Sequence, residues 1–388
     1  MKSFLLRPFE LPQAWREPEP QITRLCESFG ASLAEDITAE ADAPAYDMAL
    51  RDGWAVCAAD AAPRVIDAGS VENGHAAQAL APGHARWVNT GGPVPAGADA
   101  VIAADDPADT ERAQASIEAG RHVMRAGAEW RCGDPLIRKG TPIGAAEMAL
   151  LLEAGIDRVR VLMPPEVGVI ATGNELKDLY CQGEPGPLRV SSNSCYLRSL
   201  LLSLGVKRVH TLSAPDDEEE IARALAGLAR RTQFILTIGG TGGGLKDLTR
   251  RAILAAGGRI FDETRCRGGA LPFIAAEIGG VPVLGLPGNP LGAMMIAQRA
   301  ALPLIWSRFH AEPYRPQAVT ATFGGDIPEA VTGELCVSLR PSEAGLVALP
   351  VEKGTGCARL FREAGGVIVL RGESLRQGEQ VIVERFAN

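Results

Sequence analysis

Short hydrophobic runs alternate with amphipathic segments through the second half of the chain. The runs predict strands over 167–171, 206–212, 234–238 and 281–285. The amphipathic segments predict helices over 194–204, 218–230 and 247–256, and a further helix from Leu291. Such alternation is typical of a doubly wound, mostly parallel sheet with helices on both faces. In such sheets, ligands bind beyond the carboxyl ends of the strands.

The rest of the chain has different patterns. Residues 22–34 and 145–152 have helical spacing, whereas 41–137 is rich in Ala, Gly, Asp and Pro with short apolar runs. Short apolar runs separated by turns also fill 313–388. We therefore expect an α/β multidomain protein. Its parts are a helical domain of 1–40 and 138–165, an inserted β-rich domain of 41–137, an α/β domain of 166–312 and a C-terminal β domain of 313–388.

Composition narrows the possible partners. The chain has 39 Lys and Arg against 47 Asp and Glu, a net charge of −8, and 5% aromatic residues. This disfavours nucleic-acid binding through a basic surface or a stacking platform. No apolar stretch is long enough for a membrane span, and the N-terminal apolar run is too short for a signal peptide. The eight cysteines form no CxxC pair, so we expect reduced thiols, no zinc site and a cytoplasmic location.

The glycine-rich loop 239–244 follows a predicted strand and precedes a predicted helix. It fits neither nucleotide-binding pattern, because Leu245 stands where a P-loop needs Lys and where GxGxxG needs Gly. Its backbone N–H groups could still approach an anion, helped by the helix N-terminus. A simple tight turn between strand and helix is the alternative.

Other loops carry candidate chemistry. In the loop 286–290, Asn289 is suited either to capping a helix or to holding a ligand, and Pro290 to a first helical position. In the loop 172–176, Glu175 is suited to Mg²⁺, which favours one or two carboxylates together with ligand phosphates. A solvated or capping acid is the alternative for Glu175. The insertion adds the loops 51–55 and 89–101, of which the second is a long turn cluster with no obvious purpose in stability. A structural role is the alternative for each of them.

Taken in order, these motifs resemble one family. They are Asp52-Gly53-Trp54-Ala55, Thr90-Gly91-Gly92-Pro93-Val94-Pro95, Thr172-Gly173-Asn174-Glu175-Leu176, the segment from Gly239-Gly240 to Asp247, and Gly285-Leu286-Pro287-Gly288-Asn289-Pro290. The chain resembles the MoeA-type molybdopterin molybdotransferases, the family that includes the gephyrin E domain. The resemblance spans essentially the whole chain.

The resemblance implies a function in molybdenum cofactor biosynthesis. The family inserts molybdate into the dithiolene of adenylylated molybdopterin with Mg²⁺ and releases AMP. Its members are elongated homodimers of four-domain subunits. Their cleft lies between the sheet domain of one subunit and the first two domains of the other. Molybdenum-cofactor proteins are possible further partners; nucleic acid and membrane are not expected ones.

The resemblance also assigns residues. The implied catalytic acids are Asp52, Glu129, Glu175 and Asp247, of which Asp52, Glu175 and Asp247 are expected to hold Mg²⁺. The implied substrate-binding residues are Thr90, Gly91, Thr172, Gly173, Ser192, Asn193, Gly239, Gly240, Gly242, Gly244, Arg250, Pro287, Gly288, Asn289 and Pro290.

Departures from the family pattern leave alternatives open. The glycine loop lacks the family's serine, and the basic PGKP turn is replaced by 267–272 without its lysine. We expect at least two of Arg250, Arg265 and Arg267 to compensate beside Gly288, because arginine binds oxyanions through paired hydrogen bonds. Surface arginines paired with Asp262 and Glu263 are the alternative. A non-catalytic or altered-specificity pterin-binding scaffold, and an unrelated nucleotide-dependent transferase, remain competing hypotheses.

Overall fold

The structure is a computed structural model that describes residues 19–71, 77–177, 189–241, 248–264, 271–310, 312–351 and 359–387. The chain forms two compact units. One comprises the described parts of 1–34, 140–144 and 159–388, and the other comprises those of 35–139 and 145–158.

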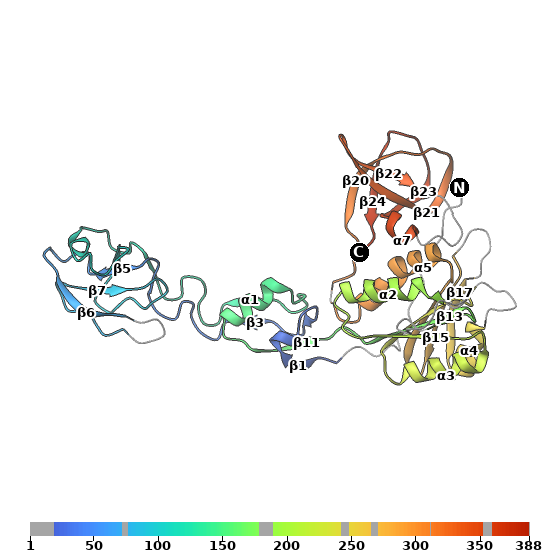
Figure 1. The fold of residues 1–388 in the computed structure, drawn as a ribbon, viewed down its shortest axis with the longest axis horizontal. Coiled ribbons are helices and arrows are strands. Elements are labelled where there is room, and N and C mark those ends of the chain that lie inside the picture. The colour runs from blue at the N-terminus through green and yellow to red at the C-terminus, as the bar shows by residue number, and fades with distance from the viewer. Residues whose placement is uncertain are drawn as a thin grey trace. The chain divides into compact units, whose positions relative to one another are not determined.

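A six-stranded sheet with the order β15-β12-β16-β19-β18-β17 forms the centre of the first unit (Figure 1). Its strands are β12 (Val167–Thr172), β15 (Val209–Ala214), β16 (Phe234–Ile238), β17 (Arg259–Thr264), β18 (Phe273–Ile278) and β19 (Val281–Leu286). The first four in sheet order are parallel, and β18 and β17 continue the sheet antiparallel. The predicted doubly wound sheet is confirmed, whereas β17 and β18 were not expected from the sequence.

Helices cover both faces of this sheet. They are α2 (Ser192–Ser203), α3 (Glu218–Ala229), α4 (Thr249–Ala255), α5 (Pro290–Ile296), the π-helical turn η3 (Ala297–Ala301) and α6 (Leu302–Trp306). Successive strand residues alternate between two cores. Val169 packs with the α2 and α5 side, and Ile170 packs with the α3 and α4 side. This alternation explains why the strands are apolar at nearly every position.

A closed barrel ends the chain, with the strand order β20-β22-β21-β23-β24. Its elements are β20 (Ala318–Phe323), β21 (Ile327–Ser342), β22 (Gly345–Pro350), the short helix α7 (Leu360–Glu363), β23 (Gly366–Leu375) and β24 (Gln380–Arg385). Cys336, Val367 and Phe386 of this region share one core with the α2 and α5 side of the sheet. The barrel is therefore packed onto the helices that cover that face.

The N-terminal part of the first unit is not helical. Residues 21–33 form β1 (Gln21–Arg24), the 3₁₀ turn η1 (Leu25–Glu27) and β2 (Ser32–Leu33), and β11 (Arg158–Leu162) lies between the two strands. The helix predicted over 22–34 is therefore wrong. Leu25 and Leu33 are buried, but Ile22 and Phe29 are 69% and 55% exposed, so the apolar spacing does not mark a buried helical face. Short β13 (Leu176–Lys177) and β14 (Arg189–Val190) pair beside the main sheet.

The second unit is mostly β structure. Its four-stranded sheet has the order β6-β7-β5-β8, and β3 pairs with β10 and β4 with β9. The elements are β3 (Ile37–Thr38), β4 (Met48–Ala49), β5 (Gly53–Val56), β6 (Val65–Val71), β7 (His84–Val88), β8 (Ala100–Ala103), η2 (Arg112–Gln114), β9 (Val123–Met124), β10 (Pro135–Ile137) and α1 (Ala145–Glu153). The helix predicted over 145–152 is confirmed as α1.

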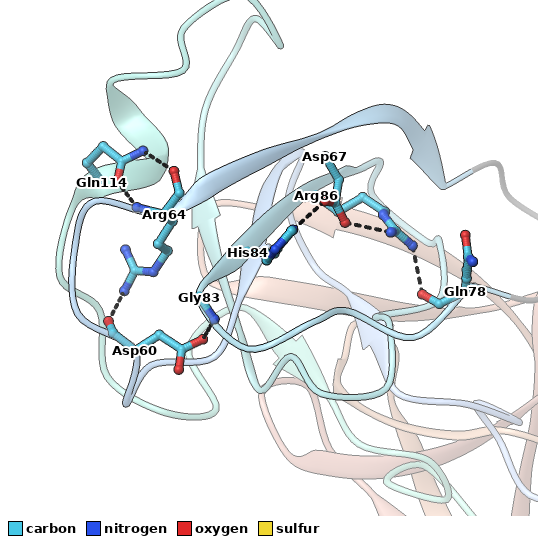
Figure 2. A network of polar contacts seen from close by, with 8 residues as sticks. All are labelled: Asp60, Arg64, Asp67, Gln78, Gly83, His84, Arg86 and Gln114. Carbon is cyan, nitrogen blue, oxygen red and sulfur yellow. Dashed lines mark hydrogen bonds and ion pairs between the residues drawn. The ribbon is translucent and has the colours of Figure 1, made fainter.

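Polar contacts fix the β6–β7 side of that sheet (Figure 2). The Asp67 carboxylate accepts from the Arg86 guanidinium and lies 2.6 Å from the His84 Nδ1. Buried Arg64 donates to the carbonyl oxygens of Asp60, Ala113 and Ala115 and so ties three turns together. These contacts stabilise the four-stranded sheet. Its apolar core includes an edge-to-face pair of Trp54 and Trp87.

Candidate functional site

The loops that follow β12, β16 and β19 meet at one end of the main sheet. These strands are parallel neighbours, so their carboxyl ends lie together. The Thr172 hydroxyl donates to the Ile238 carbonyl oxygen at 3.3 Å, and the Gly239 N–H donates to the Leu286 carbonyl oxygen at 2.9 Å. This end is also where the strand order reverses around β12, the usual position of ligands in open α/β sheets.

Two glycines at the end of β16 leave no room for side chains. Gly239 and Gly240 have φ values of 97° and 65°. A Cβ at Gly239 would lie 2.9 Å from the Thr172 Oγ1, and one at Gly240 would overlap the Thr249 Oγ1. The Thr249 hydroxyl donates to the Gly239 carbonyl oxygen at 2.8 Å and so fixes the loop. Gly242, Gly244 and Asp247 lie outside the described residues.

The loop after β19 packs against this backbone. A Cβ at Gly288 would lie 3.7 Å from the Gly239 Cα, so the two loops are neighbours. Pro287 is buried, whereas Gly288 and Asn289 are exposed. The Asn289 side chain caps α5 by accepting from the Gly292 N–H at 2.7 Å, and Pro290 is the first helical residue. The capping role foreseen as an alternative for Asn289 is confirmed.

The first turn of α2 adds a polar side chain to the same place. Asn193 is 6% exposed, and its Nδ2 donates to the Gly288 carbonyl oxygen at 2.8 Å. Its Oδ1 is buried and has no hydrogen-bond partner. Leaving such an acceptor unpaired is costly, so a ligand donor here would recover free energy. Ser192, next to it, is exposed.

The loop after β12 carries the Glu175 carboxylate. A Cβ on Gly173 would lie 2.7 Å from the Glu175 Oε2, so the carboxylate lies back over the loop. Its Oε1 is 3.9 Å from the Arg189 guanidinium, and both side chains are largely exposed. Asn174 accepts from the Asp216 N–H at 2.9 Å. The Asn174 side chain thus has a structural partner in this chain.

In the second unit, Asp52 and Thr90 form a local pair. Asp52 Oδ1 accepts from the Thr90 N–H at 2.6 Å and from the Thr90 hydroxyl at 2.8 Å. These two hydrogen bonds, the backbone one first, hold the pKa of Asp52 below its usual value. Asp52 is exposed, so an ionised carboxylate faces solvent beside the turn of Gly91, whose φ is 82°.

Glu129 and Arg250 occupy different surroundings. Glu129 is exposed, and its N–H donates to the Ala43 carbonyl oxygen. The Arg250 Nε donates to the Glu263 carboxylate at 3.0 Å, so Arg250 forms the surface pair that is the alternative to compensation. Arg265 and Arg267 lie outside the described residues. Within the described ranges, which do not include Asp247, no three His, Cys, Asp or Glu side chains gather as a metal cluster.

Sequence reasoning missed Thr249. Its hydroxyl fixes the glycine backbone, and its side chain is completely buried. A hydroxyl residue at the start of the helix after a glycine loop was the available signal. Across the described part of the chain, no helix is long and apolar enough to cross a membrane.

The chain is similar to known proteins over most of its length. Residues 6–155 match the family described as MoeA N-terminal region (domain I and II), and residues 168–306 match the family described as probable molybdopterin binding domain. Molybdopterin molybdenumtransferase 1 of Mycobacterium tuberculosis is 29% identical over 323 residues, covering 74% of both chains. Molybdopterin molybdenumtransferase of Bacillus subtilis is 27% identical over 381 residues, covering 92% of this chain and 87% of its own.

Solved structures give the same result. A molybdopterin biosynthesis MoeA protein from Pyrococcus horikoshii has a TM-score of 0.71 at 25% identity and covers 96% of this chain and 95% of its own. The two family matches reach into both units but end before the barrel, which the structural match includes. The chain therefore contains a MoeA N-terminal region followed by a probable molybdopterin binding domain, and it is similar in sequence and fold to MoeA proteins over most of its length.

Proposed function

We propose that this protein is a molybdopterin molybdenumtransferase, which inserts molybdate into adenylylated molybdopterin and releases AMP. The observation that carries the proposal is the meeting of three strand-end loops with the first turn of α2. Backbone groups of Gly239 and Gly288 lie close together there, beside the unpartnered Oδ1 of Asn193. This arrangement suits a phosphate-bearing, hydrogen-bond-donating heterocycle better than an apolar ligand.

The backbone does the anion binding in this proposal. Gly239 and Gly240 adopt the positive φ angles of this loop because neither carries a Cβ, whose place is taken by Thr172 and Thr249. Thr249 holds their peptide units in place. The Asn193 Oδ1 accepts from a ring or amide N–H of the pterin. Glycine-lined backbone of this kind stabilises pyrophosphate charge without movement during the reaction.

The carboxylates fit a hard cation. Asp52 is exposed and accepts two hydrogen bonds from Thr90, and Glu175 is exposed next to a glycine turn. Carboxylate oxygens are the ligands that Mg²⁺ prefers. We propose Asp52, Glu175 and Asp247 as its ligands, with Glu129 as a further acid. When bound, Mg²⁺ polarises the phosphoanhydride.

The test is molybdate-dependent AMP release. Purified protein, adenylylated molybdopterin, Mg²⁺ and molybdate are mixed, and AMP is measured with and without molybdate. We expect release only with molybdate, and loss of release in Asp247→Ala and Asn193→Leu. No release by the wild-type protein under any of these conditions would refute the transferase.

A pterin-binding scaffold is the second candidate. One observation favours it: Arg250, a candidate replacement for the family's lysine, is paired with Glu263. Tight binding of the pterin nucleotide without AMP release would favour this scaffold. A homodimer, a cytoplasmic location and molybdenum-cofactor proteins as recipients complete the proposal. Light scattering after size exclusion tests the dimer.

A further inference from the structure

We propose that Gln298 is a positioning residue that couples the C-terminal tail to both helices carrying the site loops, so that the tail tunes affinity for the pterin nucleotide. The inference rests on the proposed function, because it concerns the same site. Helices α2 and α5 contact each other, and α5 also contacts α7 (Figure 1). Gln298 lies at the centre of this group, in the π-helical turn that continues α5.

Every N–H of the Gln298 side-chain amide is used. Its Nε2 donates to the Tyr196 hydroxyl at 2.9 Å and to the Ala387 carbonyl oxygen at 2.8 Å. Its Oε1 accepts from the Ala387 N–H at 3.0 Å. The side chain is 4% exposed. These three bonds fix the orientation of the amide, because a flipped amide would face the Ala387 carbonyl with an acceptor.

The link continues into the site through α2. Tyr196 lies three residues after Asn193, on the same helix and about one turn away. Its ring stacks on Phe361 of α7, with centroids 4.7 Å apart and an angle of 24°. Thus Tyr196 is held by the tail through Gln298 and by the barrel region through Phe361, while Asn193 holds Gly288.

Through α5, Gln298 is also connected to the loop after β19. Asn289 caps α5, which runs without a break into the turn that contains Gln298. In that turn, Arg299 pairs with Glu334 and Glu384 of the barrel. Two successive residues therefore contact the C-terminal region. Gln298 binds the tail, and Arg299 binds two barrel strands. Only Gln298 also touches α2 among these described contacts. π-Helical turns often occur where a helix serves a local function.

The physical consequence is that the first turn of α2 and the loop after β19 are held at a fixed spacing. Tail, Gln298 and Tyr196 hold α2 against α5, so the Asn193–Gly288 hydrogen bond exists before any ligand arrives. A ligand that needs both loops then does not have to order them, and preorganisation of this kind raises affinity. Loosening the link lowers affinity and leaves the chemistry of the bound complex largely intact.

The test compares two ways of breaking the link from the C-terminal tail through Gln298 to α2. Tyr196→Phe removes only the hydroxyl acceptor and keeps the ring on Phe361. A chain that ends at Phe386 removes both Ala387 partners. Glu334→Gln is the matched control, because it weakens the Arg299 ion pair without touching α2. The measurements are the Kd of adenylylated molybdopterin, the KM and kcat of AMP release, and the Tm.

We expect Tyr196→Phe and the shortened chain each to raise Kd and KM about three- to tenfold, the worth of one lost hydrogen bond, with kcat nearly unchanged. Combined, they should be less than additive, because they break one link. Glu334→Gln should lower the Tm and leave Kd unchanged. Wild-type Kd in both Tyr196→Phe and the shortened chain overturns the inference, as does an equal rise in Glu334→Gln. A wild-type protein that binds the pterin nucleotide but releases no AMP refutes the transferase alone, since Kd still tests the link.

Discussion

The Ser32 Oγ and the His310 Nδ1 lie 2.5 Å apart, and both side chains are buried. The His310 ring also stacks on Trp306, with centroids 3.6 Å apart. Burial lowers the pKa of His310 from 6.5 to about 4. The ring is therefore neutral in the folded protein at neutral pH, and it joins the N-terminal strands to the end of α6.

This pKa predicts how stability depends on pH. Between pH 6.5 and about 4 the unfolded chain binds a proton at His310 that the folded protein does not, so the free energy of unfolding falls as pH falls. The interval between these pKa values corresponds to about 3 kcal/mol. Below pH 4 both states are protonated, and above 6.5 neither is, so the contribution is constant there. Urea unfolding between pH 4 and 8 measures it.

The control for this prediction compares the pH dependence of stability in the wild type and two variants. His310→Gln should lack this part of the pH slope, whereas Ser32→Ala, which keeps the imidazole, should retain most of it. Carboxylates titrate equally in all three proteins and cancel in the comparison. Identical slopes in wild type and His310→Gln would contradict the assignment.

The Thr90 hydroxyl should control how well Asp52 serves as a metal ligand. Thr90→Val removes one of the two hydrogen bonds that lower the pKa of Asp52, so that pKa should rise toward its usual value. We expect the Mg²⁺ concentration for half-maximal AMP release to rise about tenfold or more, as when an outer partner of a metal ligand is lost. Thr90→Ser keeps the hydroxyl and should behave like the wild type. An unchanged Mg²⁺ requirement in Thr90→Val would remove Asp52 from the metal site.

Gly240 should tolerate no side chain. Gly240→Ala would bring a Cβ against Thr249 and shift the glycine loop, so we expect Kd for the pterin nucleotide to rise about ten- to a hundredfold. Gly257→Ala is the matched control. Gly257 has a φ of 78°, but a Cβ there meets nothing within 4 Å. Gly257→Ala should lower the free energy of unfolding by about 1 kcal/mol and leave Kd unchanged. Calorimetry and thermal unfolding separate the two effects.

Gly53, in the second unit, should also tolerate no side chain. It has a φ of 151°, and a Cβ there would overlap the Ile102 carbonyl oxygen across the β5–β8 pair. Gly53→Ala should destabilise this unit by at least about 2 kcal/mol. Gly83→Ala, with a φ of 74° and open space around it, should cost about half as much. Limited proteolysis of residues 35–139 reports the difference, and equal protection of both variants would contradict the steric argument.

The sequence predicted the main sheet well because its strands are buried on both faces. The run 234–238 coincides with β16, and 218–230 with α3, whose N-cap is Asp217. The antiparallel strands β17 and β18 were missed because they belong to no strand–helix repeat. Phe273–Ile278 is apolar enough for a strand, but two glycines and β19 follow it directly.

The sequence indicates which loops form the site, but it does not indicate which residues contact one another there. That 172–176, 239–241 and 287–290 stand at strand ends follows from the alternation. That Asn193 reaches Gly288 and Thr249 reaches Gly239 depends on how the helices cross the sheet, which no local pattern encodes. The helix expected over 22–34 failed for a related reason. Pairing with β11 overrode the local spacing.

The order in which the two units can form follows from where their pieces lie in the chain. Ser32 finds its partner 278 residues later. At a synthesis rate of about 5 to 20 residues per second, the N-terminal strands wait on the order of 14 to 56 s for that partner to leave the ribosome. The four-stranded sheet of the second unit is complete once residue 103 has been made. This sheet in the middle of the chain can thus form while the N-terminal strands still lack their partner.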